Sequence, residues 1–215
     1  MTDPENRRPL ASRKTGWANR TARWLAGTRI TPNQISQIGM VAALLAGLCF
    51  WAAGACTGFG RGLALLAGAG FCQLRLLCNL FDGMVAIEAR RGAPDGRFWN
   101  EFPDRVSDAL ILIGLALGLD VPGLGWAAVS FAFLTAYVRE LGIGLGQGAD
   151  FSGPMAKQHR IALVTGAAVL SVFEPVWNGQ GQILNAALWV MVVGAVLTVA
   201  RRSWRLIMKL HAQQA

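Results

Sequence analysis

The chain has 215 residues, of which 53% are hydrophobic and 15% charged, and its mean hydropathy is +0.40. This composition excludes an ordinary soluble globular protein and favours a membrane protein. The formal net charge of +8 raises the question of nucleic-acid binding. However, Lys and Arg gather near alternate ends of the apolar stretches, as topology signals do, and this argues against a nucleic-acid partner.

The N-terminal arm, residues 1–30, is basic and precedes the first apolar stretch. Within 15–29, helical spacing puts Trp17, Thr21, Trp24 and Leu25 on one face, with basic residues beside it. This pattern is typical of an amphipathic helix in the membrane interface. A basic, solvated tail attracted to anionic lipid explains the same residues, and the sequence leaves both interpretations open.

Six apolar stretches follow, each near the roughly 20 residues that a membrane-spanning helix needs. We expect spans at about 35–56, 61–86, 100–119, 123–145, 159–176 and 183–208. Thr31 followed by Pro32 predicts a capped helix start just before the first span. The expected fold is therefore all-α and polytopic, with an interfacial amphipathic helix followed by one six-helix membrane domain over 31–215.

The distribution of Lys and Arg predicts the orientation of these spans. An even number of spans puts both termini and the loops after the second and fourth spans on one side, and most of the positive residues lie there. The positive-inside rule makes that side cytoplasmic, which predicts an integral protein of the inner (cytoplasmic) membrane if the organism is bacterial. Arg61 is the main exception, and Arg75 lies within the second span with no partner evident from the sequence.

The most informative segment is NLFDGMVAIEARRGAPDGRFWNEFPDRVSD, residues 79–108. Helical spacing puts Asn79 and Asp82 on one face of the second span and Asn100, Asp104 and Asp108 on one face of the third. Ionisable groups at the edge of an apolar bundle are costly, so they predict a functional site. Carboxylate and amide oxygens are ligands of hard divalent cations, and the site is expected to face the cytoplasm.

This segment resembles the signature of the CDP-alcohol phosphatidyltransferase family, D-x-x-D-G-x-x-A-R, eight or nine residues, then G-x-x-x-D-x-x-x-D. The matching positions are Asp82, Gly83, Ala86, Gly96 and Asp104. Asn79, Ile87 and Asn100 stand in place of Asp, Arg and Asp.

Two further segments carry the resemblance beyond the signature. TPNQIS at 31–36 is similar to the family's entry to its first membrane helix, and Arg139-Glu140 with the later Gly153 and Lys157 resembles its cytoplasmic basic pocket. The resemblance therefore covers nearly the whole chain.

The resemblance implies transfer of a phosphatidyl group from a CDP-activated lipid such as CDP-diacylglycerol to an alcohol acceptor, with release of CMP, in phospholipid biosynthesis. It also implies that Asn79, Asp82, Asn100 and Asp104 hold one or two Mg²⁺ or Mn²⁺ ions. Asp104 is then the candidate catalytic base. Asp108, one turn further along the helix, is a third carboxylate and the alternative base.

The resemblance and the charge pattern together predict the substrate-binding residues Asn33, Gly83, Ala86, Arg90, Gly96, Arg139, Lys157 and Arg160. The two small residues after Asp82 would face the cytidine, and Arg90 or Arg91 would reach the place of the arginine missing from the signature. The last three cations would bind a phosphorylated alcohol such as glycerol 3-phosphate or an inositol phosphate. Helix packing explains the small residues equally well, and topology alone explains the cations.

Two other functional classes remain open at this point. A degenerate family member would bind CDP-lipid or regulate a partner without turnover. A small transporter would carry its polar groups near the bilayer midplane at interrupted helices, whereas these groups lie at a cytoplasmic edge. The resemblance also implies a homodimer, and membrane lipids are expected partners.

Overall fold

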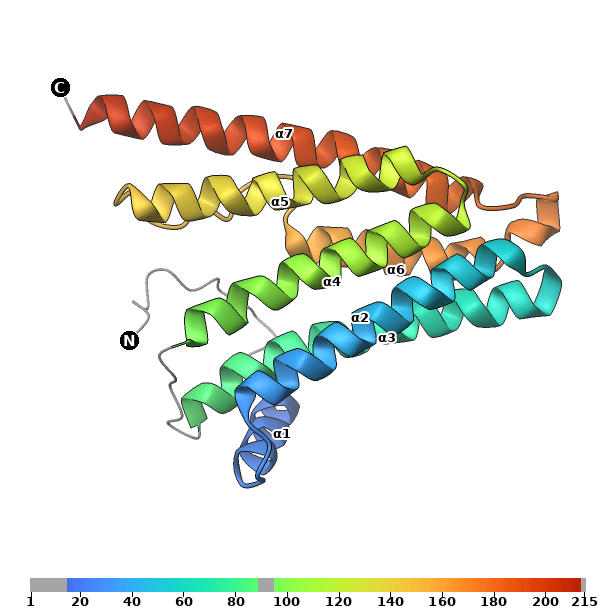
Figure 1. Cartoon of the computed structure of the whole chain (residues 1–215), viewed down its shortest axis with the longest axis horizontal. Coiled ribbons are helices and arrows are strands. Elements are labelled where there is room, and N and C mark those ends of the chain that lie inside the picture. The colour runs from blue at the N-terminus through green and yellow to red at the C-terminus, as the bar shows by residue number, and fades with distance from the viewer. Residues whose placement is uncertain (1–14, 89–94, 214–215) are drawn as a thin grey trace.

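The computed structural model describes residues 15–88 and 95–213, and within these ranges the chain is helical, with no strand. The helices are α1 (Gly16–Ala26), α2 (Pro32–Ala55), α3 (Gly58–Glu88), α4 (Gly96–Gly118), α5 (Pro122–Gly144), α6 (Lys157–Ser171) and α7 (Gln182–Ala212), with a short 3-10 helix, η3 (Glu174–Trp177), between the last two (Figure 1). The all-α expectation is confirmed for the described residues, and α2 to α7 match the six expected stretches.

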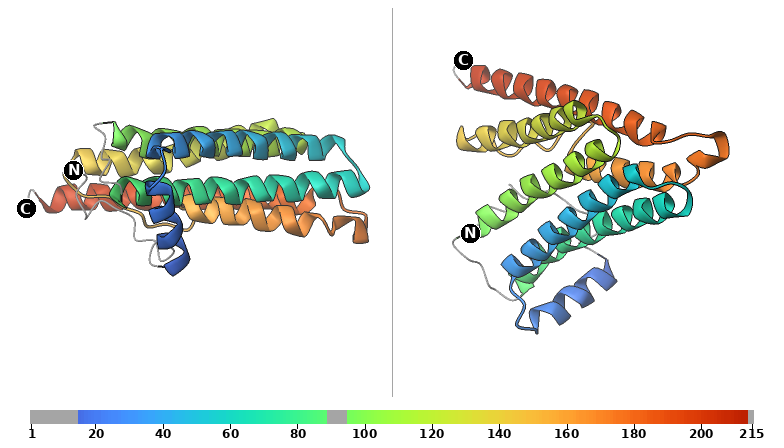
Figure 2. Two further views of the ribbon diagram at one scale, coloured as in Figure 1. Left: turned by 90° about the horizontal axis from the view of Figure 1, so that it is seen from below. Right: turned by 45° about the vertical axis from the view of Figure 1, so that its right-hand side comes forward.

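Helices α2 to α7 form a closed ring. α2 packs against α3 and α4, α4 against α5, α5 against α7, α7 against α6, and α6 against α3. All six run roughly along one axis, as Figures 1 and 2 show. Large apolar side chains fill the interior, among them Phe50, Leu65, Ile111, Leu188 and Met191. The ring is therefore a packed bundle with an apolar core.

The outer surface of the bundle is apolar as well. Large side chains such as Trp51, Trp126 and Trp189 are more than half exposed. Within the described residues, α2, α3, α5 and α7 are long and apolar enough to cross a bilayer. α4 is too rich in charge for that criterion, and α6 is too short at 15 residues. An apolar surface of this extent belongs in lipid, so the chain is an integral membrane protein.

Helix α1 lies across one end of the bundle, beside the start of α2 and the end of α3 (Figures 1 and 2). It buries Ala18 and Ala22 in a small cluster with residues of α3, and the Trp17 and Phe81 rings meet edge to face with centroids 6.0 Å apart. Trp24 is 68% exposed. The face that contacts the protein is thus the alanine face, and Trp24 points outward. Its location in a membrane interface stays a prediction.

The start of α2 is capped as the sequence predicts. The Thr31 hydroxyl accepts a hydrogen bond from the backbone N–H of Gln34, and the Gln34 side chain accepts one from the backbone N–H of Thr31. This capping box, with Pro32 at the first helical turn, fixes where α2 begins. It also fixes the helical position of Ser36, one turn further on.

α2 and α4 cross through a glycine seam, which we define as Gly47, Gly54, Gly114 and Gly118. A Cβ added to Gly114 would lie 2.3 Å from the Gly47 carbonyl oxygen, and one added to Gly54 would lie 2.0 Å from that of Gly118. No side chain fits at such distances, so the close approach of the two backbones requires glycine. The seam holds α4 against α2 in the half of the bundle opposite α1.

The same half contains a buried ion pair. Glu174 of η3 is fully buried, and its carboxylate pairs with Arg61 of α3 at 2.8 Å. It also accepts hydrogen bonds from the backbone N–H groups of Gly181 and Ile183. Arg61, the exception in the charge pattern, therefore ties the start of α3 to the connection between α6 and α7.

Candidate functional site

Asp104 of α4 is the centre of a polar network at the α1 end of the bundle. Only 6% of Asp104 is exposed, and its carboxylate forms ion pairs with Arg75 of α3 and Lys157 of α6. The Asn79 side chain donates to Asp104 Oδ1 at 3.3 Å, and Lys157 Nζ donates to Asn79 Oδ1 at 2.6 Å. Three helices thus bring two residues of the signature-like segment into contact with each other and with a distant lysine.

Arg75 is a member of the network that the sequence did not connect to it. Its Nε donates to Ser107 Oγ at 2.7 Å, and the residue is 4% exposed. The partners lie on α4, about 30 residues away, so local spacing cannot identify them. The available signal was the position of Arg75 inside an apolar helix, because a charge in such a place needs a partner.

Asp82 lies beside the network and is held by α2. It is 8% exposed, accepts a hydrogen bond from Ser36 Oγ at 2.8 Å and another from the backbone N–H of Gly83 at 2.6 Å. The charges of Asp104 and Lys157 are near enough to interact with that of Asp82. Ser36 is a further residue that sequence reasoning missed, since a serine near a helix start has no distinctive signal.

Asp108 has different surroundings from Asp104. Its carboxylate pairs with Arg160 of α6 at 2.6 Å, and each residue is 2% exposed. Arg160 also donates to the Met155 carbonyl oxygen at 3.2 Å and to Thr135 Oγ1 at 3.4 Å. The two residues form an enclosed ion pair between α4 and α6, and their catalytic and substrate-binding roles stay predictions.

The other predicted residues of the segment lie around the network. Asn100 is exposed, and its side-chain nitrogen is 3.4 Å from Glu101 Oε1. Gly83 and Ala86 are half-buried on α3, and Gly96 is exposed at the first residue of α4. Arg90 lies outside the described residues.

Asn33, the candidate near the start of α2, contacts the residue before α4. Its side-chain nitrogen lies 3.4 Å from Asp95 Oδ2, an oxygen that also accepts from Trp99 Nε1 at 2.8 Å. Asn33 therefore joins the beginnings of α2 and α4 at the same end of the bundle as the network.

Arg139 of α5 lies on the neighbouring side of α4. It pairs with Glu101 of α4 and with Glu140, and its guanidinium lies over the Phe151 ring, 5.5 Å from the centroid. Arg139, Lys157 and Arg160, predicted as one anion pocket, thus contact three different sets of acidic partners. Each of the three cations pairs with a different carboxylate: Glu101, Asp104 or Asp108.

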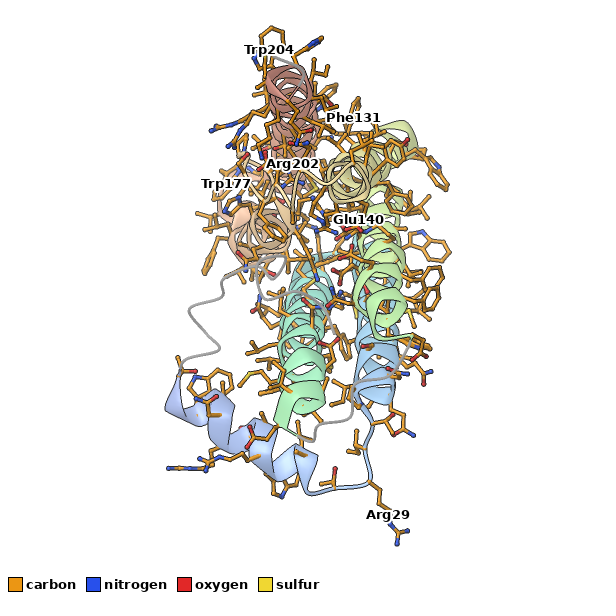
Figure 3. All side chains as sticks on the ribbon, turned by 90° about the vertical axis from the view of Figure 1, so that its left-hand side faces the viewer. Arg29, Phe131, Glu140, Trp177, Arg202 and Trp204 are labelled. Atoms are coloured by element: carbon orange, nitrogen blue, oxygen red, sulfur yellow. The ribbon has the colours of Figure 1, made fainter. Side chains whose placement is uncertain are left out.

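A small basic cavity lies between α5 and α7, and Arg139 is one of its lining residues. The other cations that line it are Arg202, Arg205 and Lys209 of α7. Arg202 is 5% exposed and donates to the Thr135 and Ser152 carbonyl oxygens at 2.6 and 2.8 Å. In Figure 3, Arg202 lies on the inner side of α7, whereas Trp204 points away from the bundle.

Asp150, in the connection between α5 and α6, is the acidic residue that lines this cavity. Burial acts to raise its pKa, but hydrogen bonds from Ser152 and the charges of Arg205 and Arg202 outweigh burial and hold the pKa below its ordinary value. Asp150 is therefore ionised at neutral pH. It offsets part of the positive charge and orients Arg205, whose Nη1 is 3.4 Å from Asp150 Oδ2.

The oxygen donors of the network suit a hard divalent cation. The described residues contain no group of three or more His, Cys, Asp or Glu side chains placed to hold a metal. The available donors are the Asp82 and Asp104 carboxylates and the amide oxygen of Asn79, which are oxygen ligands of the kind that Mg²⁺ and Mn²⁺ prefer. Their oxygen atoms are of the type that a divalent ion binds, but they supply less negative charge than four aspartates would, and Asp104 is already paired with Arg75 and Lys157.

Comparisons with known proteins agree with this chemistry. No family model matches the chain. Curated relatives include the phosphatidylinositol phosphate synthase of Cutibacterium acnes, 28% identical over 209 residues, covering 88% of this chain and 93% of the relative. The enzyme of the same name from Mycolicibacterium smegmatis is 26% identical over 183 residues, covering 80% and 76%.

A crystal structure of Mycobacterium tuberculosis phosphatidylinositol phosphate synthase with CDP-DAG bound has a TM-score of 0.73 to this chain at 21% identity, covering 88% of this chain and 92% of that one. A second structure of that enzyme, in complex with manganese and citrate, has the same TM-score. The chain therefore shares the fold of that synthase. The named relatives and the shared fold are consistent with the resemblance of segment 79–108 to the signature of the CDP-alcohol phosphatidyltransferase family.

Proposed function

We propose that this protein transfers a phosphatidyl group from a CDP-activated lipid such as CDP-diacylglycerol to an alcohol, releasing CMP, in phospholipid biosynthesis. The observation that carries the proposal is the contact between Asn79 of α3 and Asp104 of α4, the first and last residues aligned with the signature. The named activities of the relatives and the CDP-DAG complex of the structural neighbour support it.

Asp82 is the residue best placed to hold a divalent cation, Mg²⁺ or Mn²⁺, and Asn79, Asn100 and Asp104 are the further ligands that the resemblance implies. When bound, the cation neutralises charge on the diphosphate oxygens and so favours departure of CMP. Gly83 and Ala86, which are half-buried and follow Asp82 on α3, would face the nucleotide. Ser36 orients the Asp82 carboxylate.

Asp104 is our candidate for the base that accepts the proton of the attacking hydroxyl. Its ion pairs with Arg75 and Lys157 keep the carboxylate ionised, and a proton acceptor must be in that form. Burial excludes much of the water that would otherwise compete as nucleophile. Asp108 is the alternative base, and its enclosure with Arg160 makes it the more distant of the two from solvent.

We also propose a topology of six spans, with α4 and α6 completing the set, and with both termini and the polar network on the cytoplasmic side. The asymmetry of Lys and Arg supports that orientation. A charged, buried network at one end of α4 explains why that helix has low hydropathy although it packs within the ring. The homodimer stays a prediction.

The acceptor we propose is a phosphorylated alcohol of the inositol phosphate class. The basic cavity between α5 and α7, with Arg139, Arg202, Arg205 and Lys209, supplies guanidinium and ammonium donors that recognise phosphate. The names of the relatives support an inositol phosphate over glycerol 3-phosphate. In this proposal Arg139 binds acceptor, as predicted, and Lys157 and Arg160 act closer to Asp104 and Asp108.

The decisive experiment is CMP release by the purified protein in detergent, supplied with CDP-diacylglycerol, Mg²⁺ or Mn²⁺, and inositol, inositol phosphate, glycerol or glycerol 3-phosphate. We expect metal-dependent release with inositol phosphate, reduced at least about 100-fold in Asp82→Ala and Asp104→Ala. Glu88→Ala, which removes an exposed carboxylate at the end of α3, is the matched control. Arg205→Gln should raise the KM for the phosphorylated acceptor and leave the KM for CDP-diacylglycerol unchanged.

The alternative is a degenerate relative that binds CDP-lipid without turnover. The residues Asn79, Ile87 and Asn100 favour that alternative, because two of them lack the negative charge that the signature has at its metal ligands. Retained binding of CDP-diacylglycerol with no CMP release from any acceptor would support the degenerate relative and refute the enzyme.

A further inference from the structure

The ammonium group of Lys157 lies where the signature-like residues converge. Its Nζ contacts Asn79 Oδ1 at 2.6 Å and forms an ion pair with Asp104 Oδ2. We propose that Lys157 replaces one divalent cation in this site, so that the protein holds one metal ion, on the Asp82 side, where a two-metal site would hold a pair. This inference rests on the proposed function and specifies the cations that act in it.

The contacts of Asp104 are the geometric support for the replacement of a metal ion by Lys157. Arg75 binds Oδ1 and Lys157 binds Oδ2, so both oxygens of the carboxylate are on protein cations. Arg75 is anchored on Ser107 and is nearly fully buried, and it cannot leave without stranding a charge. A metal ion bound by both Asn79 and Asp104 would have to displace Lys157 from the same two oxygens.

The asparagine at position 79 is the chemical support for the replacement of a metal ion by Lys157. An amide oxygen is a good hydrogen-bond acceptor for an ammonium group, which carries one charge and three N–H donors. A divalent ion, in contrast, gains most from charged ligands. Asn79 and one carboxylate oxygen therefore suit a lysine better than they suit Mg²⁺. An aspartate at position 79 would favour binding of a divalent ion over binding of the lysine ammonium group.

Asp82 keeps the character of a metal ligand. Among the described residues, the contacts of its carboxylate are with the Ser36 hydroxyl and the Gly83 amide, and no ion pair includes it. Hydrogen bonds of this kind orient a ligating carboxylate without neutralising it. The site thus has one carboxylate committed to protein cations and another available to a metal.

The charges of the network and of its ligand also favour one metal ion over two. The charges of Arg75 and Lys157 offset those of Asp82 and Asp104, and Arg105 Nη2 also lies 3.7 Å from Asp104 Oδ2, so the network has no excess of negative charge before any ligand binds. A CDP-lipid carries a negative charge on each phosphate of its diphosphate, and a single divalent ion balances that ligand. A second divalent ion would leave an excess of positive charge in a largely buried site, which is unfavourable.

The test is the number of Mn²⁺ ions bound per chain, measured by electron paramagnetic resonance on the full-length protein in detergent with CDP-diacylglycerol present. We expect about one tightly bound ion for the wild type and about two, with the spectral broadening of a close Mn²⁺ pair, for Asn79→Asp combined with Lys157→Gln. Lys157→Gln keeps a hydrogen-bonding group and tests the loss of charge alone. Lys209→Gln, which removes a lysine from the basic cavity, is the control and should leave the count unchanged.

Two tightly bound ions in the wild type would overturn the inference, and so would an unchanged count in the Asn79→Asp, Lys157→Gln protein that still melts cooperatively. Metal counting does not depend on turnover. A wild type that binds one Mn²⁺ yet releases no CMP would therefore refute the proposed enzyme while leaving the replacement of a cation by Lys157 intact. CMP release by a wild type that binds two Mn²⁺ ions would refute the replacement of a cation by Lys157 and leave the proposed enzyme intact.

Discussion

The buried pair of Asp108 and Arg160 allows a quantitative prediction. Asp108→Asn removes the negative charge and leaves the guanidinium, which is 2% exposed, without its ionic partner. Removing one partner of a buried ion pair costs about 3–5 kcal/mol. At about 2–4 °C per kcal/mol for a chain of this size, the melting temperature should fall by roughly 6–20 °C.

A comparison with a variant that lacks both buried charges separates this structural effect from catalysis. Thermal unfolding in detergent would be followed for Asp108→Asn, for Arg160→Met, and for Asp108→Leu combined with Arg160→Met. The combined variant has no buried charge at this place, so it should melt closer to the wild type than either single variant does. A single variant that melts within about 2 °C of the wild type and has lost CMP release would refute the reasoning and favour Asp108 as the base.

Two further predictions concern the half of the bundle opposite α1. Glu174→Gln should lower the free energy of unfolding by about 1.5–3 kcal/mol, because Arg61 loses a charged hydrogen-bond partner; an unchanged melting curve in detergent would contradict this. Gly114→Ala should lower it by about 1–3 kcal/mol, because a Cβ there meets the Gly47 backbone, whereas Gly70→Ala, with nothing within 4 Å of the added Cβ, should be neutral. Equal melting temperatures for the two alanine variants would exclude the seam as a close contact.

Much of the fold follows from local features of the sequence. The six apolar stretches and the turns between them match α2 to α7 within a few residues, and the Thr31 cap forms as expected. Both depend on residues close together in the chain, where propensity and hydropathy act directly. The outward direction of Trp24 on α1 was not predictable in this way. It follows from the packing of Ala18 and Ala22 against α3, a contact between different helices.

The candidate site was predicted only in part, since its contacts join different helices. Spacing placed Asp104 and Asp108 on one face of α4, yet four residues advance a helix by more than a full turn and by about 6 Å along its axis. That offset is enough for Asp104 to meet α3 and Lys157 while Asp108 meets Arg160. Ser36, Ser107 and Arg75 entered the network through helix packing, which no single segment encodes.

The glycine seam has a mechanical consequence for the site. Gly114 and Asp104 are ten residues apart on one continuous helix, or about 15 Å, and α2 carries Ser36 toward the same end. Because the seam joins the two helices backbone to backbone, we expect them to move together as one rigid unit, held in the half of the bundle opposite α1. A small widening there tilts Asp104 relative to Asn79, so substitutions that touch no polar residue can change the alignment on which phosphoryl transfer depends.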